Sequence, residues 1–198
     1  TGEGYDMTNH WDYWIFPDRP APTVQAACDD GLRGKLSKRY AGLVPPDTAG
    51  KSLIWIADSL RAEHLDHLAR GGDLLLLGSK PFPTRKTSFQ IGNAGRPHHN
   101  VATVIHDHPI WDGFPHEGFC DWQFFPMFTN GTCRGTIFND LKIPFEPILE
   151  VVSSYKDVKL QAAIWEAQIQ GGGRLLVNGC GLDIDDPGGA ELLDRILS

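Results

Sequence analysis

The fold prediction starts from the stretch GGDLLLLG at Gly71–Gly78. A short, continuous apolar run bounded by glycines is typical of a strand that is buried on both faces. Just before it, residues 60–70 are predicted to form a helix with a stripe of leucines, capped by Asp58 or Ser59. The apolar run SLIWIA at residues 52–57 predicts another buried strand. Strand, helix and strand in such quick succession predict a βαβ crossover between parallel strands.

Other predicted elements extend this pattern in both directions along the chain. Further strands are predicted at residues 23–28, 100–105, 133–138, 145–152 and 174–178, and further helices at residues 30–39 and 160–169 and from Pro187 onward. Residues 160–169 are assigned to a helix because they are rich in helix-forming residues and a glycine pair follows them. Asp186 has the residue type expected at the cap of the final helix. In the middle of the chain, residues 80–100 are interrupted by prolines and glycines and are predicted to form a loop. The chain is therefore predicted to be an α/β domain with a parallel sheet.

Residues 1–20 differ from the rest of the chain in their aromatic content. The aromatic residues of this segment are Tyr5, Trp11, Tyr13, Trp14 and Phe16. Residues 12–16 are predicted to form a strand, and the two prolines that follow are predicted to belong to a linker. We expect residues 1–20 to be a packed aromatic lead-in and residues 21–198 to form the α/β domain.

Length and composition limit the possible functions. A chain of 198 residues suits one domain with a substantial core. The net charge of −7 disfavours nucleic acids and anionic membranes as partners, because both attract basic surfaces. No apolar run approaches the ~20 residues that span a bilayer, and no signal peptide is recognisable. The chain opens at Thr1 without an initiator methionine, which fits a piece cut from a longer protein.

The four cysteines are widely spaced and include no C-x-x-C pair. This spacing argues against a structural zinc site and against a disulfide-dense scaffold. A bond between Cys120 and Cys133 is an open possibility in a secreted protein. Cys180 lies between two glycines after a predicted strand, but residues 182–187 delay the next helix, so a packing role is favoured over that of a nucleophile.

The loop after the strand at Gly71–Gly78 occupies the position where open parallel sheets usually hold their active sites. A nucleophile elbow needs small residues on both sides of the nucleophile. Ser79 is followed by Lys80 and Pro81, and the proline disfavours helical geometry at the residue before it. We therefore predict a rigid loop here. Ser79 is a candidate to face a ligand but not to attack one.

The stretch from His106 to Phe125, HDHPIWDGFPHEGFCDWQFF, contains most of the residues that could carry chemistry. Three histidines invite a zinc site, but proline and glycine leave His116 unconstrained relative to the other two, and no metal site is predicted. Cys120 four residues after His116 could form a Cys–His pair on one helix face, although a half-buried structural thiol is favoured. Elsewhere, Glu166 is expected on the exposed face of its helix and His98-His99 in a solvated loop. The candidate ligand-facing residues are Ser79, His106, His108, Trp111, Asp121 and Trp122.

The order of several motifs resembles a known family. Asp107–Phe125 is similar to a motif of the class I glutamine-amidotransferase-like domains that are appended to glycoside hydrolase family 2 (β-galactosidase-like) enzymes. WDYWIFP at Trp11–Pro17, FEPIL at Phe145–Leu149 and the stretch Ile164–Val177 resemble the same family, so that the likeness covers nearly the whole chain. A more distant resemblance, through His108-Pro-Ile, is to trehalose-utilisation proteins.

This resemblance implies a flavodoxin-like, three-layer α/β sandwich with a mostly parallel sheet and helices on both faces. It also implies a non-catalytic accessory domain of a secreted or periplasmic glycoside hydrolase, with no cofactor. Its partners would be the neighbouring domains, a possible oligosaccharide and a possible second copy of the chain. Glutaminase activity is not carried over, because Ser79-Lys80-Pro81 stands where the family has a cysteine between glycines. The alternatives are a small hydrolase or isomerase for sugar derivatives, using His106, His108, Asp121 or Cys120, and a purely structural spacer.

Overall fold

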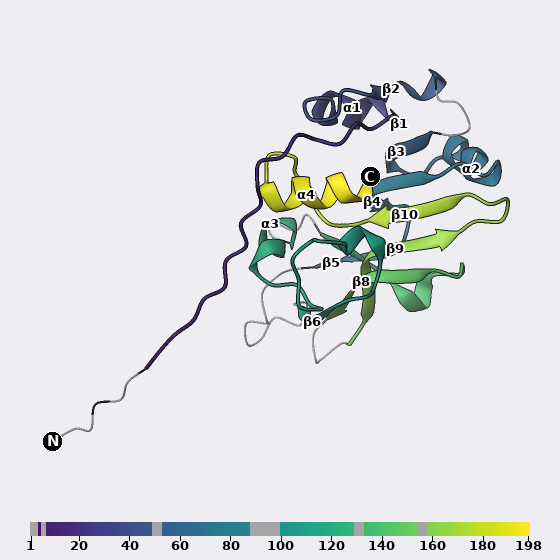
Figure 1. Cartoon of the computed structure of the whole chain (residues 1–198). Coiled ribbons are helices and arrows are strands. Elements are labelled where there is room, and N and C mark those ends of the chain that lie inside the picture. Colours follow the sequence, from purple (N-terminus) through teal and green to yellow (C-terminus); the bar gives the residue numbers. More distant parts are fainter. Residues whose placement is uncertain (1–3, 5–6, 49–52, 88–99, 129–132, 154–157) are drawn as a thin grey trace.

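The computed structural model describes residue 4 and residues 7–48, 53–87, 100–128, 133–153 and 158–198. These residues form a ten-stranded mixed sheet with helices packed against it (Figure 1). The helices are α1 (Asp30–Leu36), α2 (Ala62–Ala69), α3 (Phe125–Phe128) and α4 (Pro187–Ile196), with short 3-10 turns η1 (Pro46–Thr48), η2 (Pro109–Trp111), η3 (Trp122–Phe124) and η5 (Phe138–Asp140). His98 and His99, which were predicted to lie in a solvated loop, are outside the described ranges.

One half of the sheet is parallel. Its strands, in spatial order, are β2 (Leu43–Val44), β1 (Ala26–Cys28), β3 (Ile54–Ser59), β4 (Leu74–Lys80) and β10 (Arg174–Asn178). The predicted βαβ crossover is therefore confirmed, with α2 joining the parallel strands β3 and β4. Because β10 joins the far side of β4, residues about a hundred positions apart in sequence, such as Leu74 and Leu175, become direct neighbours.

The other half of the sheet is antiparallel and branches at β9. Its strands are β9 (Leu160–Gln168), β7 (Arg134–Ile137), β5 (Thr84–Lys86), β8 (Glu146–Ser153) and β6 (Asn100–Ile105). β9 pairs antiparallel with β10, β7 and β8, and these lead on to β5 and β6. The strands predicted around β6, β7, β8 and β10 are confirmed, and β5 lies within the segment that was predicted to be loop.

The predicted flavodoxin-like, mostly parallel sandwich is wrong. Half of the sheet is antiparallel, and residues 160–169, predicted to be a helix, form the strand β9 at the branch point. The physical reason is burial. Residues 161–165 are buried between two cores, so packing on both faces outweighs the helix propensity of alanine and leucine. With a strand in this place, the chain returns antiparallel to β10 through the tight turn at Gly171 and Gly172, both of which have positive φ.

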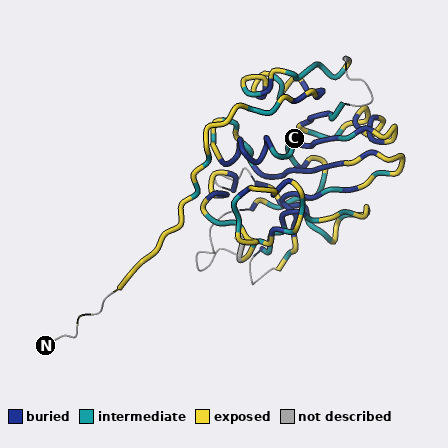
Figure 2. The backbone as a smooth tube through the Cα atoms, viewed as in Figure 1, coloured by how far each residue is buried: buried dark blue, intermediate teal, exposed yellow. Residues whose placement is uncertain are grey.

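Side chains on the two faces of the sheet form two separate cores. Figure 2 shows that many of the buried residues lie along the central strands and the facing helices. Leu36 of α1 and Leu192 of α4 belong to the larger core. Leu68 of α2 belongs to the smaller one, together with Trp165 of β9. α4 begins as predicted, because the Asp186 carboxylate accepts the Gly189 backbone N–H at 2.7 Å and Pro187 occupies the first position.

Helix α2 differs in detail from its prediction. Asp58 and Ser59 belong to β3 instead of capping the helix, and the helix begins at Ala62. Its buried face carries His64 and His67 beside Leu68, while Leu65 of the predicted stripe is exposed. The sequence pattern missed this because imidazoles substitute for aliphatic side chains against an aromatic wall. The His64 ring meets Trp55 edge-on, with centroids 4.6 Å apart.

The aromatic lead-in runs over the surface and then away from the domain (Figures 1 and 2). Within the described residues 7–25 the chain forms neither helix nor strand, so the strand predicted at residues 12–16 is wrong. A lone extended segment is assigned to a strand only when another strand pairs with it. Phe16 packs on Phe114 at a centroid distance of 5.5 Å and anchors the segment to the larger core. The domain boundary near residue 20 stays a prediction.

None of the helices in the described ranges combines the length and the apolar character that crossing a bilayer requires.

Candidate functional site

A cleft of about 700 Å³ lies at the carboxyl ends of β3, β4 and β10. This is the edge where open parallel sheets bind ligands. Its polar lining comes from Lys35, Asp58, Ser59, Ser79, Lys80, Thr84 and Arg134. Lys35 is paired with Asp183 at 3.0 Å, and the Asp185 backbone N–H, followed by Lys35, lowers the pKa of Asp183. The wall of the cleft therefore mixes both signs of charge.

Ser79 lies inside strand β4, which continues through Lys80, so the rigid loop predicted here begins two residues later than expected. The Ser79 carbonyl accepts the Phe82 N–H at 2.8 Å, so that a turn follows the strand instead of a helix. The side chain is buried in the cleft wall. None of the described residues that line the cleft is a histidine. A histidine base, the commonest activator of a serine nucleophile, is therefore missing from this set.

The cysteines are free thiols. Hydrogen bonding to Cys133 and burial raise the pKa of Cys180, which lines the cleft. Burial also raises the pKa of the Cys120 thiol. Since the thiolate is the nucleophile, both groups are poor nucleophiles at neutral pH. The Cys–His pair considered for Cys120 and His116 does not lie on a helix, and His116 Nδ1 accepts the Gly118 N–H at 3.1 Å.

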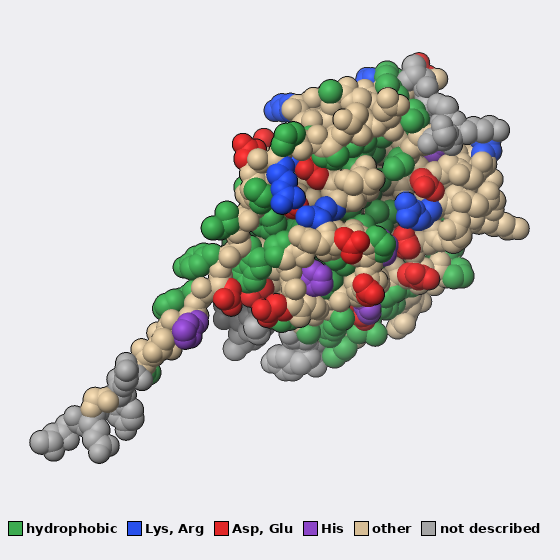
Figure 3. Space-filling view, viewed as in Figure 1, with side chains coloured by type: hydrophobic (Ala, Val, Ile, Leu, Met, Phe, Trp, Pro, Cys, Tyr) green, Lys and Arg blue, Asp and Glu red, His purple; other side chains and the backbone are tan. Residues whose placement is uncertain are grey.

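The remaining polar candidates each contact a different group. His106 Nε2 lies 2.9 Å from Glu150 Oε2, and His108 Nε2 lies 3.5 Å from Glu166 Oε2. His108 Nδ1 also accepts the Ile110 N–H at the start of η2. Figure 3 shows histidine and acidic side chains interspersed on the face that it draws. Glu166 is thus half-buried on a strand, not exposed on a helix as predicted.

Asp121 serves as the cap of η3, where its carboxylate accepts the Trp122 N–H at 2.7 Å. Among the described residues, no group of three or more histidine, cysteine, aspartate or glutamate side chains is arranged to hold a metal ion. Ser79 thus lines the cleft, His106 and His108 each contact a different glutamate, and Asp121 caps η3.

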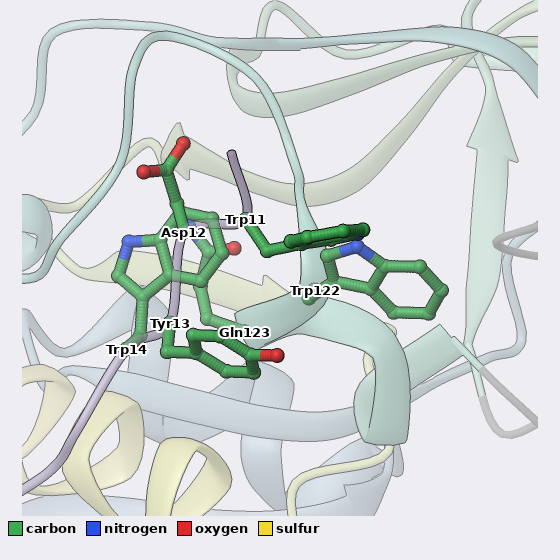
Figure 4. A pocket seen from close by; sticks show the side chains of 6 residues that line it. All are labelled: Trp11, Asp12, Tyr13, Trp14, Trp122 and Gln123. Atoms are coloured by element: carbon green, nitrogen blue, oxygen red, sulfur yellow. The ribbon is translucent and has the colours of Figure 1, made fainter. Parts of the chain in front are cut away.

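A second hollow, of about 440 Å³, lies between the aromatic lead-in and η3 (Figure 4). Its lining residues are Trp11, Asp12, Tyr13 and Trp14 from the lead-in and Trp122 and Gln123 from η3. We call these six residues the aromatic pocket. The exposed fractions are 70% for Trp11, 83% for Tyr13 and 62% for Trp122. Trp122 is also braced by the Phe125 ring at 5.6 Å.

Trp111, the other tryptophan predicted to face a ligand, is only 4% exposed. It packs among Phe114, Phe124 and His116 in the larger core, so that prediction is corrected. Sequence reasoning missed Trp11, Tyr13 and Trp14 as pocket residues. The signal was present in the unusual aromatic density of residues 1–20, but nothing in the sequence indicated that they would meet Trp122.

Gln123 gives the aromatic pocket a polar floor. The residue is 6% exposed, and its Nε2 donates to the Pro115 carbonyl at 2.9 Å. That bond fixes the orientation of the amide, because only the NH₂ group can donate. Oε1 has no hydrogen-bond partner among the described residues. Buried acceptors usually have one, so this oxygen is a candidate to receive a hydroxyl from a bound ligand.

The fold and its two hollows define a domain with a mixed sheet, a cleft whose lining includes Ser79 and Cys180, and an aromatic pocket. The chain belongs to the family described as "Domain of unknown function (DUF8487)", which matches residues 55–198. No curated protein matches it. The matched range begins inside β3, so it contains Trp122 and Gln123 but not the aromatic lead-in.

The buried thiols predict a loss of stability at alkaline pH. Burial, followed by the Asp29 carboxylate, raises the pKa of Cys28 to about 12, whereas an unfolded thiol titrates near about 8.5. The buried, protonated Cys28 thiol makes its full contribution to the free energy of unfolding at pH values below the pKa of the unfolded thiol. This contribution is lost as the pH rises toward the folded pKa, because only the unfolded state then releases its proton. Burial raises the pKa of Tyr40 in the same direction.

We therefore expect the free energy of unfolding, measured by urea denaturation with reductant present, to fall between pH 9 and pH 11. In Cys28→Ala the decline should be shallower, by up to about 1.4 kcal/mol per pH unit for the missing proton. Equal slopes for the two proteins would contradict the raised thiol pKa.

Proposed function

We propose that the chain is a non-catalytic, sugar-binding accessory domain of a secreted or periplasmic carbohydrate-degrading enzyme. The aromatic pocket carries this proposal. Aromatic rings have a negative face, and the C–H groups on the flat face of a pyranose ring are weakly positive, so the two stack favourably. A pocket with exposed tryptophans and a few polar groups suits a ligand that is apolar on its faces and hydroxylated on its edges.

The polar groups of the pocket complement the rings. Asp12 accepts hydrogen bonds only, and Gln123 Oε1 offers a buried acceptor that is otherwise unused within the described structure. Both therefore call for donors, which sugar hydroxyls supply. The net charge of −7 favours a neutral glycan over an acidic one.

A non-catalytic role is supported by the separation of the polar candidates. The cleft holds Ser79 without a histidine among its described lining residues, and His106 and His108 contact different glutamates. The resemblance to domains appended to glycoside hydrolases supplies the context of a larger enzyme. The neighbouring domains of that enzyme would be the partners of this chain.

Titration with a panel of neutral oligosaccharides, followed by tryptophan fluorescence, tests the proposal. We expect at least one to shift the emission, and Trp122→Ala to weaken its binding about tenfold, since an aromatic stacking contact is worth about 1–3 kcal/mol. Phe119→Ala is the matched control, because Phe119 is an exposed aromatic residue that does not line the pocket. Its affinity should be unchanged.

A double-mutant cycle tests whether the lead-in and η3 bind one ligand together. Trp11→Ala and Trp122→Ala should be non-additive, because both side chains line the same pocket. Hydrolysis of aryl glycosides that is lost in His108→Ala would overturn the non-catalytic assignment. Absence of any spectral shift across the panel would overturn the sugar-binding one.

A further inference from the structure

Two buried thiols meet beside the cleft at the carboxyl ends of the strands. Cys133 Sγ and Cys180 Sγ lie 3.6 Å apart. Cys133 is completely buried just before β7, and Cys180, 7% exposed, forms part of the cleft wall after β10. In a disulfide the two sulfurs would lie ~2.05 Å apart.

The backbone segments that carry the two cysteines lie against each other. The Arg134 N–H donates to the Gly179 carbonyl at 2.8 Å, so the residues next to each cysteine are hydrogen-bonded to each other. A Cβ placed on Gly179 would lie 2.0 Å from the Arg134 carbonyl oxygen, so the two backbones are in direct contact. Because a disulfide needs its two Cα atoms within about 7 Å, this ladder-like contact is the framework that it requires.

The other cysteines are less well placed. Cys28 lies on β1, and strands β3 and β4 separate it from β10. Cys120, which the sequence offered as the partner of Cys133, lies close enough for its charge to influence the pKa of Cys180. The sulfur–sulfur contact is between Cys133 and Cys180.

We propose that Cys133 and Cys180 are a disulfide-forming pair that is closed by thiol–disulfide exchange with a small disulfide such as oxidised glutathione. The Cys180 thiol, on the cleft side, is protonated in most molecules at neutral pH. The small fraction that loses its proton to solvent attacks one glutathione sulfur, so this step is slow and becomes faster as the pH rises. One glutathione thiolate leaves and takes up a proton. Cys133 then loses its proton, and its sulfur attacks Cys180 Sγ and releases the second glutathione thiol. Two electrons pass from the protein to glutathione, and one protein S–S bond replaces the S–S bond of the reagent.

The bond would join the two halves of the sheet. It links the start of β7, in the antiparallel half, to the loop after β10, in the parallel half. It would also fix one wall of the cleft. Such a bond persists in the oxidising compartments to which secreted and periplasmic proteins are exported. This inference is independent of sugar binding, since neither cysteine lines the aromatic pocket.

The test is to equilibrate the purified full chain in a glutathione redox buffer at pH 8 and then to count free thiols after denaturation. We expect four thiols in the reduced chain and two in the oxidised chain, with a mass lower by two hydrogen atoms. Peptide mapping should recover Cys133 linked to Cys180. Cys28→Ser is the matched control and should still lose two thiols. Cys133→Ser and Cys180→Ala should lose none by internal pairing.

The proposal fails if the oxidised wild type keeps four thiols, retains a glutathione adduct without closing the internal bond, or yields a linked peptide that contains Cys120. Because the wild type and the Cys28→Ser control decide the result, poor folding of the Cys133 or Cys180 variants does not affect it.

Discussion

Replacement of Trp165 by alanine should lower the free energy of unfolding by about 3–5 kcal/mol, the range seen when a large aromatic side chain is removed from a core. Trp165 is completely buried at the centre of β9. Phe82 and Phe145 meet its ring edge-on, at centroid distances of 4.9 Å and 5.6 Å. Its Nε1 donates to Thr136 Oγ1 at 2.9 Å, so the truncation creates a cavity and also leaves a buried hydroxyl without this partner.

Urea denaturation followed by circular dichroism measures this effect. Trp11→Ala is the control, because that side chain is exposed on the lead-in and its loss should change stability by less than about 0.5 kcal/mol. Trp165→Phe, which keeps a ring but loses the N–H donor, should fall between the two. A loss below about 1 kcal/mol in Trp165→Ala would show that β9 is not buried on both faces.

Asp194→Ala should be destabilising by a similar amount, about 3–5 kcal/mol, because it breaks a buried ionic network from one side. The Asp194 carboxylate on α4 accepts Arg39 Nε at 2.8 Å and the Tyr40 hydroxyl at 2.6 Å, and a second guanidinium nitrogen also donates to it. Tyr40 is completely buried. Without the carboxylate, the partly buried Arg39 guanidinium and the completely buried Tyr40 hydroxyl lose their acceptor.

Thermal and urea denaturation of matched aspartate variants test this expectation. Asp183→Ala also removes a carboxylate from an ion pair, but its pair with Lys35 is about half exposed and should contribute at most about 1 kcal/mol. Combining Asp194→Ala with Arg39→Met should recover part of the loss, because the stranded charge is then gone. Equal stabilities of Asp194→Ala and Asp183→Ala would contradict the network.

The elements that the sequence predicted correctly are those whose local pattern and tertiary environment agree. The run at Leu74–Leu77 is apolar on both faces and is a central parallel strand, and Asp186-Pro187 opens α4 with its expected chemistry. Among the incorrect predictions, that for residues 160–169 has the largest consequence. Their alanines and leucine favour a helix locally, and the antiparallel return that buries them depends on β7, β8 and β10, which are distant in sequence. One incorrect element changed the fold class.

The candidate site was predictable only in part, for a similar reason. Trp122 was selected as a ligand-facing aromatic residue and is exposed, whereas Trp111, eleven positions earlier, was selected on the same grounds and is buried. Sequence shows which residues are aromatic but not which side of a short 3-10 turn faces the core. The contact of Trp11 with the same hollow as Trp122 joins segments more than a hundred residues apart, and no local pattern encodes it.

The open margins of the sheet bear on how copies of this protein behave when crowded together. β2 offers only two residues and β5 only three, two of them the cations Arg85 and Lys86. Beside β6, the Ile105 N–H already donates to Gly118, and the Cys120 N–H donates to the Thr103 hydroxyl. Along these described edge strands, few unpaired backbone N–H and C=O groups are therefore available to pair with a strand of a neighbouring molecule. These described edge strands therefore disfavour assembly of the protein into extended intermolecular sheets.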